Sequence, residues 1–348
     1  MGNVSVSTED ASESNILTDA FVILDVGHGN SAVLLDSGHV VVFDTGPRSI
    51  LLEFLREHSI THVDTVLLSH ADSDHIGGLS ALLSSDMITI GKVRANTDSL
   101  KGSKEWDDIA YELSRNDDID FQPILTVDNT GEFDTSHVSI KIEAPTSYLA
   151  SRGAGSTDRN GRHLDINSMS AVVRLIYKDV PFALLPGDMD WIGLNNILED
   201  ERDISANMII FPHHGGRPGT SRFEDFVKSL IGTVEPSTVL FSIGRGRYGT
   251  PRPEIIKAIL THFPKTRIAC TQLSEHCAKT PPTSNVNSHL SSLHAQGKSS
   301  HSCCAGTIIY YFRKGVFHPE QGTHARFVRK FTDSPLCKIE TLSPSSNE

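Results

Sequence analysis

The sequence predicts a mixed α/β fold in one large domain. Short apolar runs typical of buried strands alternate along most of the chain with patterns typical of amphipathic helices. The candidate functional motifs extend from residue 72 to residue 214 without a linker, so one domain fits better than the two that a length of 348 residues would suggest. This pattern is compatible with two packed mixed sheets flanked by helices, although it leaves a single-sheet α/β fold open.

The apolar patterns place the individual elements. We expect strands at residues 21–26, 31–36, 39–44, 63–68, 138–144, 170–177, 181–185, 207–211 and 237–242. Residues 266–271 and 306–312 are also strand-like. We expect helices at residues 48–58, 77–84, 105–115, 190–199, 221–230 and 253–262.

The two ends differ from this core. We expect a disordered tail over residues 1–18, a folded domain over 19–318 with a polar loop inserted at 277–304, and an extension over 319–348. Within the extension, residues 325–331 could form an edge strand or contact a partner. The first basic residue is Arg48, so a secretory signal is not expected, and no apolar run reaches the roughly 18 residues of a membrane span. We therefore expect a cytoplasmic protein without membrane contact.

Four metal-type ligands occupy six positions in the segment HADSDHIGG, which spans residues 70–78. They are His70, Asp72, Asp74 and His75. The segment follows an apolar strand and ends in two glycines before a helical pattern, so its side chains should converge at the carboxyl edge of a sheet, where ligand sites form. An Asp-rich turn is the alternative, but it explains the aspartates and not the paired histidines. We predict a metal site.

The types of ligand limit the metal. Histidine nitrogen and aspartate oxygen without cysteine suit Zn, Mn or Fe rather than a closed thiolate zinc site. Four ligands, with more expected later in the chain, exceed what one tetrahedral ion with an open position requires. We expect two divalent ions, Zn or Mn, which together activate a water and hold a phosphoryl or carbonyl group.

These ligands resemble the HxHxDH signature of the metallo-β-lactamase fold, with Asp72 in place of the second histidine. Further segments make the chain similar to the metallo-β-lactamase-like domain of ComEC-type DNA-uptake proteins over most of residues 21–262. They are FVILDVGHGNSAVLL from Phe21, VFDTG from Val42, INSMSAVVRL from Ile166, FALLPGDMD from Phe182, FPHHGG from Phe211 and IGRGRYGTPRPE from Ile243. The resemblance implies an αββα four-layer sandwich, and because no apolar run could span a membrane we expect a stand-alone version without the membrane channel of those proteins.

The resemblance also implies that Asp188 bridges the ions and that the pair His213-His214 supplies a ligand. Asn167 stands at the position where the family's third motif has a metal ligand. The residues alone leave alternatives. Asp188 precedes a helical pattern and could be its N-cap, whereas an amide such as Asn167 is a poor ligand and common in turns. One histidine could bind metal while the other positions or protonates a leaving group. We count Asp188, His213 and His214 as metal ligands, Asp74 and His214 also as catalytic, and Asn167 as a substrate contact.

Two positions depart from the family. Asn30 replaces a usual aspartate in the first turn, and Thr250 replaces the histidine of a YGHP box. Neither change touches the predicted metal ligands, but either could remove a group that transfers a proton or orients the substrate. His28 and Tyr248 remain in these loops as candidates for contacting substrate or supporting a ligand, although either could be an ordinary loop residue.

The net charge of −12 argues against a broad non-specific DNA-binding surface. Two loops nonetheless carry basic residues that could border the metal site and hold phosphates, with solvated surface residues as the alternative. They are Arg245, Arg247 and Arg252 in one loop, and Arg159, Arg162 and His163 in the other. We expect Arg245, Arg247 and Tyr248 to bind substrate.

Four cysteines lie in or beside the polar loop, with His276 and His301 near them. They are Cys270, Cys277, Cys303 and Cys304. A structural zinc, a disulfide and free thiols are all open, although the spacing matches no standard zinc finger and free thiols fit a reducing compartment best.

Three functions fit these observations. The first is a metal-dependent phosphodiesterase or nuclease that acts on a nucleic acid or nucleotide, which the loop arginines favour. The second is a hydrolase of an amide, lactam or thioester, which needs the same water but an acyl-binding cleft. The third is a metal-bearing regulatory subunit with protein partners in a multi-component system, such as antiviral defence.

Overall fold

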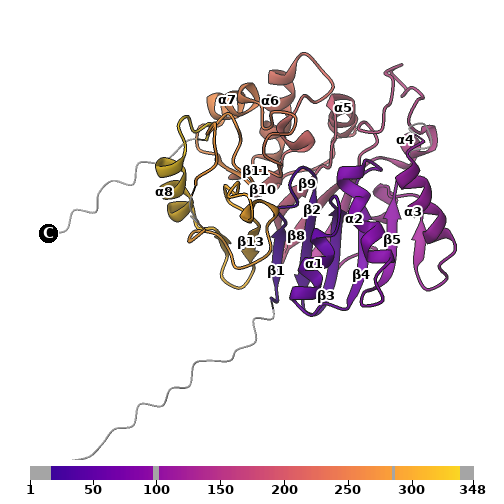
Figure 1. Ribbon diagram of the computed structural model, residues 1–348. Coiled ribbons are helices and arrows are strands. Elements are labelled where there is room, and N and C mark those ends of the chain that lie inside the picture. The colour runs from indigo at the N-terminus through magenta and orange to yellow at the C-terminus, as the bar shows by residue number, and fades with distance from the viewer. Residues whose placement is uncertain (1–16, 97–101, 284–286, 338–348) are drawn as a thin grey trace, which may run out of the picture.

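The computed structural model describes residues 17–96, 102–283 and 287–337. Two β-sheets pack against each other and helices cover both outer faces, as Figure 1 shows. This αββα arrangement confirms the expected fold and excludes the single-sheet alternative. Residues 1–16 of the predicted tail and 338–348 of the predicted extension lie outside the described residues.

The first sheet has eight strands in the order β14-β13-β1-β2-β3-β4-β5-β6. They are β1 (Ala20–Ile23), β2 (Ser31–Asp36), β3 (His39–Thr45), β4 (His62–Leu68), β5 (Thr89–Ala95), β6 (Asp120–Gln122), β13 (Ile308–Tyr311) and β14 (Val316–His318). Strands β3 to β6 pair in parallel, whereas β1 pairs antiparallel with β2 and β13. Strand β1 thereby joins two distant parts of the chain.

The second sheet has six strands in the order β12-β11-β10-β9-β8-β7. They are β7 (Val138–Ala144), β8 (Val172–Tyr177), β9 (Val180–Leu185), β10 (Met208–Ile210), β11 (Thr238–Phe241) and β12 (Arg267–Cys270). Strands β9 to β12 are parallel. Their carboxyl ends therefore meet at one edge of the sheet, where loops from successive strands can form a site.

Eight α-helices flank the sheets within the described residues. They are α1 (Ile50–Glu57), α2 (Ser73–Leu83), α3 (Lys104–Ser114), α4 (Ser147–Arg152), α5 (Trp191–Glu199), α6 (Phe223–Val234), α7 (Pro253–His262) and α8 (Gln321–Phe331). Apolar residues of α1 to α3 pack on the first sheet and those of α5 to α7 on the second. Side-chain alternation creates the layers, since Val42 of β3 faces the helices whereas Val41 and Phe43 face the other sheet. None of these helices is long and apolar enough to cross a membrane.

The structure corrects the C-terminal prediction. Residues 325–331 belong to helix α8, which rules out the edge strand that was one of the two possibilities for this segment. The buried residues of α8 are His324, Phe327 and Val328, and their spacing of three and four is that of one helix face. This face packs against Leu273 and Cys304, so the helix covers the polar loop.

The polar loop is built into the fold through a buried carboxylate that follows β1. Asp25 accepts hydrogen bonds from the backbone of Gly297 at 3.0 Å and from the side-chain amide of Gln272 at 2.8 Å. Burial raises the pKa of Asp25, and these donors oppose that effect. The loop therefore supports the glycine-rich turn at residues 27–30, which leads into the functional site.

Candidate metal centre

The predicted ligand segment lies where β4 ends and α2 begins. His70 and Asp72 stand in the connection, and Asp74 and His75 stand in the first turn of the helix. Both histidines are buried, whereas Asp74 and Asp72 are partly exposed toward a cleft. Asp72 occupies the N-cap position of α2 without a side-chain capping bond, and its Oδ2 lies 3.8 Å from Nε2 of His70.

Two groups of potential metal ligands form among the described residues. In the first, His70, His75 and Asp188 place one ligand atom each within 4.8 Å of one another. In the second, Asp74, His214 and His28 do the same. The resemblance did not assign His28 to the metal site, and the structure makes it a candidate ligand.

Asp188 lies between the two groups. Its Oδ1 is 3.4 Å from Nε2 of His75 and 3.8 Å from Nε2 of His214. The helix-cap alternative is wrong, because the N-cap of α5 is Asp190, whose carboxylate accepts a hydrogen bond from the backbone of Gly193 at 2.7 Å. The position of Asp188 agrees with a bridging role.

The donor set fits divalent ions. Nε2 of His70, His75 and His214 is buried and has no hydrogen-bond partner among the described residues. Such orphaned nitrogens are rare in native proteins, and a bound cation would account for them. Burial, together with the neighbouring His75, lowers the pKa of His70 to about 4, so the ring is in the neutral form that metal ions bind. Imidazole and carboxylate together suit Zn or Mn.

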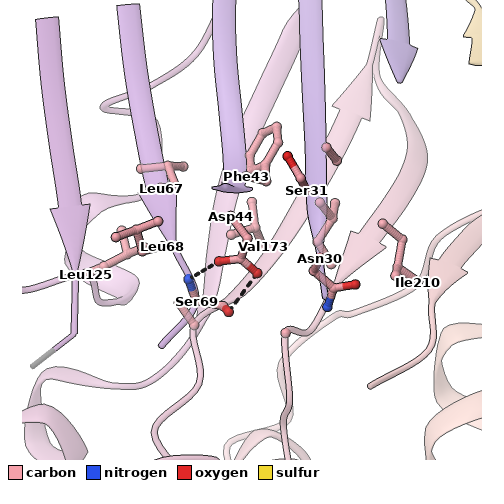
Figure 2. A pocket seen from close by; sticks show the side chains of 14 residues that line it. Asn30, Ser31, Phe43, Asp44, Leu67, Leu68, Ser69, Leu125, Val173 and Ile210 are labelled. Atoms are coloured by element: carbon pink, nitrogen blue, oxygen red, sulfur yellow. Dashed lines mark hydrogen bonds between the residues drawn. The ribbon is translucent and has the colours of Figure 1, made fainter. Parts of the chain in front are cut away.

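Asp44, at the end of β3, orients this cluster. Its Oδ2 accepts a hydrogen bond from Nδ1 of His75 at 2.7 Å, which turns Nε2 of that ring toward Asp188. The same carboxylate accepts bonds from the backbone and hydroxyl groups of Ser69 at 2.7 and 2.9 Å, as Figure 2 shows. Sequence reasoning did not single out Asp44, although the segment VFDTG after a strand could have drawn attention to it.

The two adjacent histidines take different roles. They lie in a 3-10 turn over Pro212–Gly215, and both have left-handed backbones, with φ of 53° and 54°. His214 donates from Nδ1 to the carbonyl of Ser242 at 2.8 Å, which leaves Nε2 for the second ligand group. His213 stays outside both groups, with Nδ1 3.5 Å from Oδ2 of Asp188.

A cleft with an empty volume of about 1170 Å³ opens over the cluster. Its lining includes Asp72, Asp74, Asp188, His213 and His214 together with Arg217, Arg247, Tyr248, Thr250 and Arg252. Sequence reasoning missed Arg217, which follows the His-His-Gly-Gly segment directly. The side chain of Tyr248 is 64% exposed, and the guanidinium of Arg247 lies over its ring at 5.2 Å.

Other predicted contacts do not reach the cleft. The guanidinium of Arg245 donates to the carbonyls of Leu273 and Ala278 at 2.8 Å, so this residue holds the polar loop. Arg162 pairs with Asp158 and Glu199, and the cleft lining does not include Asn167. The structure thus contradicts the expectation that Arg245 and the loop before Asn167 border the metal site.

The cysteines form no disulfide. Cys270, Cys277, Cys304 and Cys337 line one enclosed pocket, and Sγ of Cys304 is 3.2 Å from Nε2 of His324. Neither potential ligand group within the described ranges contains a cysteine. The structure therefore favours free thiols over a structural zinc at this loop.

Comparison with known proteins agrees with this fold. Residues 24–150 match the family model of the metallo-beta-lactamase superfamily. ComE operon protein 3 of Bacillus subtilis (strain 168) is 23% identical over 264 residues, which cover 69% of this chain but only 30% of that protein. The match therefore spans less than a third of its length.

Two solved structures are similar at low identity. YhfI of Bacillus subtilis, a metallo-beta-lactamase fold protein, is 12% identical with a TM-score of 0.45, and the match covers 72% of this chain and 96% of YhfI. Tm1679, described as a metal-dependent hydrolase of the beta-lactamase superfamily, is 19% identical with a TM-score of 0.44, covering 72% of this chain and 95% of that one. The αββα sandwich and the match of residues 24–150 together show that the chain has a metallo-β-lactamase fold and is similar to part of ComE operon protein 3.

Proposed function

We propose that this protein is a phosphodiesterase or nuclease that uses a dinuclear metal centre. The observation that carries the proposal is the cleft itself, where three arginines border the two groups of carboxylates and imidazoles. Arg217 and Arg247 are exposed, and neither has a carboxylate partner among the described residues. Free guanidinium groups beside a cation site suit a substrate with several negatively charged oxygens.

The residues divide the work according to position. The two ligand groups, with Asp188 between them, would hold two divalent ions, which supply an activated water and charge neutralisation when bound. Asp74 and His214, expected to be catalytic, act in this proposal by holding an ion. His213 lines the cleft outside both groups, and in this proposal it gives a proton to the leaving oxygen.

The cleft arginines and Tyr248 would bind the substrate. Arg217, Arg247 and Arg252 hold phosphate oxygens, and the exposed ring of Tyr248 offers a surface on which a base can stack. Because the whole chain carries a net charge of −12, this attraction is local to the cleft. We propose a nucleic acid or nucleotide as substrate.

The test is to reconstitute the full chain with Mn or Zn, measure bound metal by elemental analysis, and assay single- and double-stranded DNA, RNA and bis-p-nitrophenyl phosphate. A lactam and a thioester serve as acyl controls. We expect about two metal equivalents per chain and metal-dependent cleavage of a phosphodiester. Turnover of the acyl substrates alone would overturn the proposal. Two bound ions without any turnover would instead favour a regulatory subunit with protein partners.

A further inference from the structure

We propose that His28 is a direct ligand of one of the two metal ions, in a site completed by Asp74 and His214. This inference rests on the metal-dependent part of the proposed function and not on its substrate. Nε2 of His28 lies 3.4 Å from Oδ2 of Asp74, and Nε2 of His214 lies 3.3 Å from the same oxygen. All three potential ligand atoms lie within 4.8 Å of one another.

These spacings are those of ligands around an ion. With metal–ligand distances of about 2.0–2.1 Å, neighbouring ligand atoms of a tetrahedron stand roughly 3.3–3.4 Å apart. A hydrogen bond between an imidazole and a carboxylate would bring the two atoms to about 2.7–2.9 Å. The measured 3.4 and 3.3 Å in this group agree with the first geometry and exceed the second.

The backbone fixes His28 relative to Asp74. Gly27 and Gly29 on either side have φ of 79° and 143°. A Cβ at Gly29 would stand 2.3 Å from the carbonyl oxygen of Asp74, and the next residue, Asn30, donates its N–H to that oxygen at 3.1 Å. The glycine-rich turn is thus bound to the first turn of α2, and only a residue without Cβ permits this approach.

Packing also holds the imidazole in place. The centroid of the His28 ring lies 4.3 Å from that of His214 and 4.5 Å from that of Tyr248. Its side chain is 9% exposed. A packed, buried ring presents a fixed nitrogen, as a metal ligand must.

The experiment replaces His28 with glutamine and with cysteine in the full-length protein loaded with cobalt. His28→Gln can still donate a hydrogen bond to Asp74 but is a poor ligand, so one of two metal equivalents should bind at least about tenfold more weakly. His28→Cys should bring a new thiolate-to-cobalt charge-transfer band in the near ultraviolet, which only direct ligation produces. His163→Gln and His163→Cys, at an exposed position outside the cleft, serve as matched controls.

A missing charge-transfer band in folded, cobalt-loaded His28→Cys would overturn the inference, even if His28→Gln weakened metal binding. Unchanged affinity for both ions in His28→Gln would overturn it as well. Because neither measurement requires turnover, a protein without phosphodiesterase activity can still confirm His28 as a ligand. A protein that cleaves phosphodiesters but lacks the charge-transfer band in His28→Cys would refute the ligand role and leave the proposed function intact.

Discussion

Neutralising the cleft arginines should weaken the dependence of catalysis on salt by a calculable amount. Arg217, Arg247 and Arg252 line the cleft, and only Arg252 has a nearby carboxylate, Glu254 at 3.6 Å, among the described residues. Each phosphate contact made to a single strand contributes about 0.7 to the slope of log affinity against log salt. Three contacts therefore contribute a slope of about 2. A rise from about 50 to about 200 mM salt should then reduce kcat/KM of the wild type by a factor roughly 16 times larger than for the triple glutamine variant.

The assay is kcat/KM for a fluorescent single-stranded oligonucleotide, measured across this salt range with Mn or Zn present. A second triple variant, with Arg56, Arg115 and Arg329 changed to glutamine at exposed positions outside the cleft, removes the same net charge. Metal content and turnover of bis-p-nitrophenyl phosphate should stay near wild type in both variants. Equal salt slopes for the wild type and the cleft variant, or equal loss in the two variants, would refute a phosphate-binding role.

Three other predictions follow from single carboxylates. Asp188→Asn should lose metal, as elemental analysis would show. Asp190→Ala should keep its metal, but the loss of the α5 cap should lower the free energy of unfolding in urea by about 1 kcal/mol. Asp44→Asn should weaken metal binding by about 10- to 100-fold in a chelator competition, because His75 loses its charged partner. Burial alone would raise the pKa of Asp36. Hydrogen bonds from Thr135 and His137 outweigh burial, so the pKa lies below its usual value. The unfolding free energy should therefore fall as the pH drops below about 4, and less so in Asp36→Asn.

The local part of the site could be predicted from the sequence, because one loop and one helical turn hold the ligands. His70 to His75 fall within six residues, so their spacing alone indicated a metal site. Asp188 could be assigned to the metal site only through the resemblance. Asp190 stands before the same helix, and the local sequence does not tell which of the two aspartates caps it. Asp44 could not be found in this way, because only the parallel pairing of β3 and β4 brings it beside Ser69 and the ligand loop.

Side-chain direction limited the prediction of the substrate residues. Arg245 and Arg247 lie two positions apart in one loop, yet the first points to carbonyls of the polar loop and the second lines the cleft. The carbonyls that bind Arg245 come 28 and 33 residues later, so no local pattern reveals them. The role of Arg217 had no signal beyond its position after the His-His-Gly-Gly segment.

Strand β5 shows the corresponding limit for the fold. Its sequence TIGKVRA contains a glycine and two basic residues, which do not read as a buried strand. Arg94 is nevertheless fully buried, because its guanidinium pairs with Asp120 and Glu132 at 2.7 Å. Gly91 is also required, since a Cβ there would approach the carbonyl of Asp64 to 2.8 Å. Both features depend on partners that other segments supply.

The long-range pairing of β1 has a consequence for synthesis on the ribosome, where a chain emerges from its N-terminus. Strand β1 meets β13 only after residue 308 has appeared, and Asp25 gains its distant partners only with Gln272, Gly297 and Thr307. Until then the turn that carries His28 lacks this support. A nascent chain halted before residue 272 already contains all six residues of the two ligand groups but not these contacts, so we expect it to hold an ion at His28, Asp74 and His214 more weakly than the folded protein does.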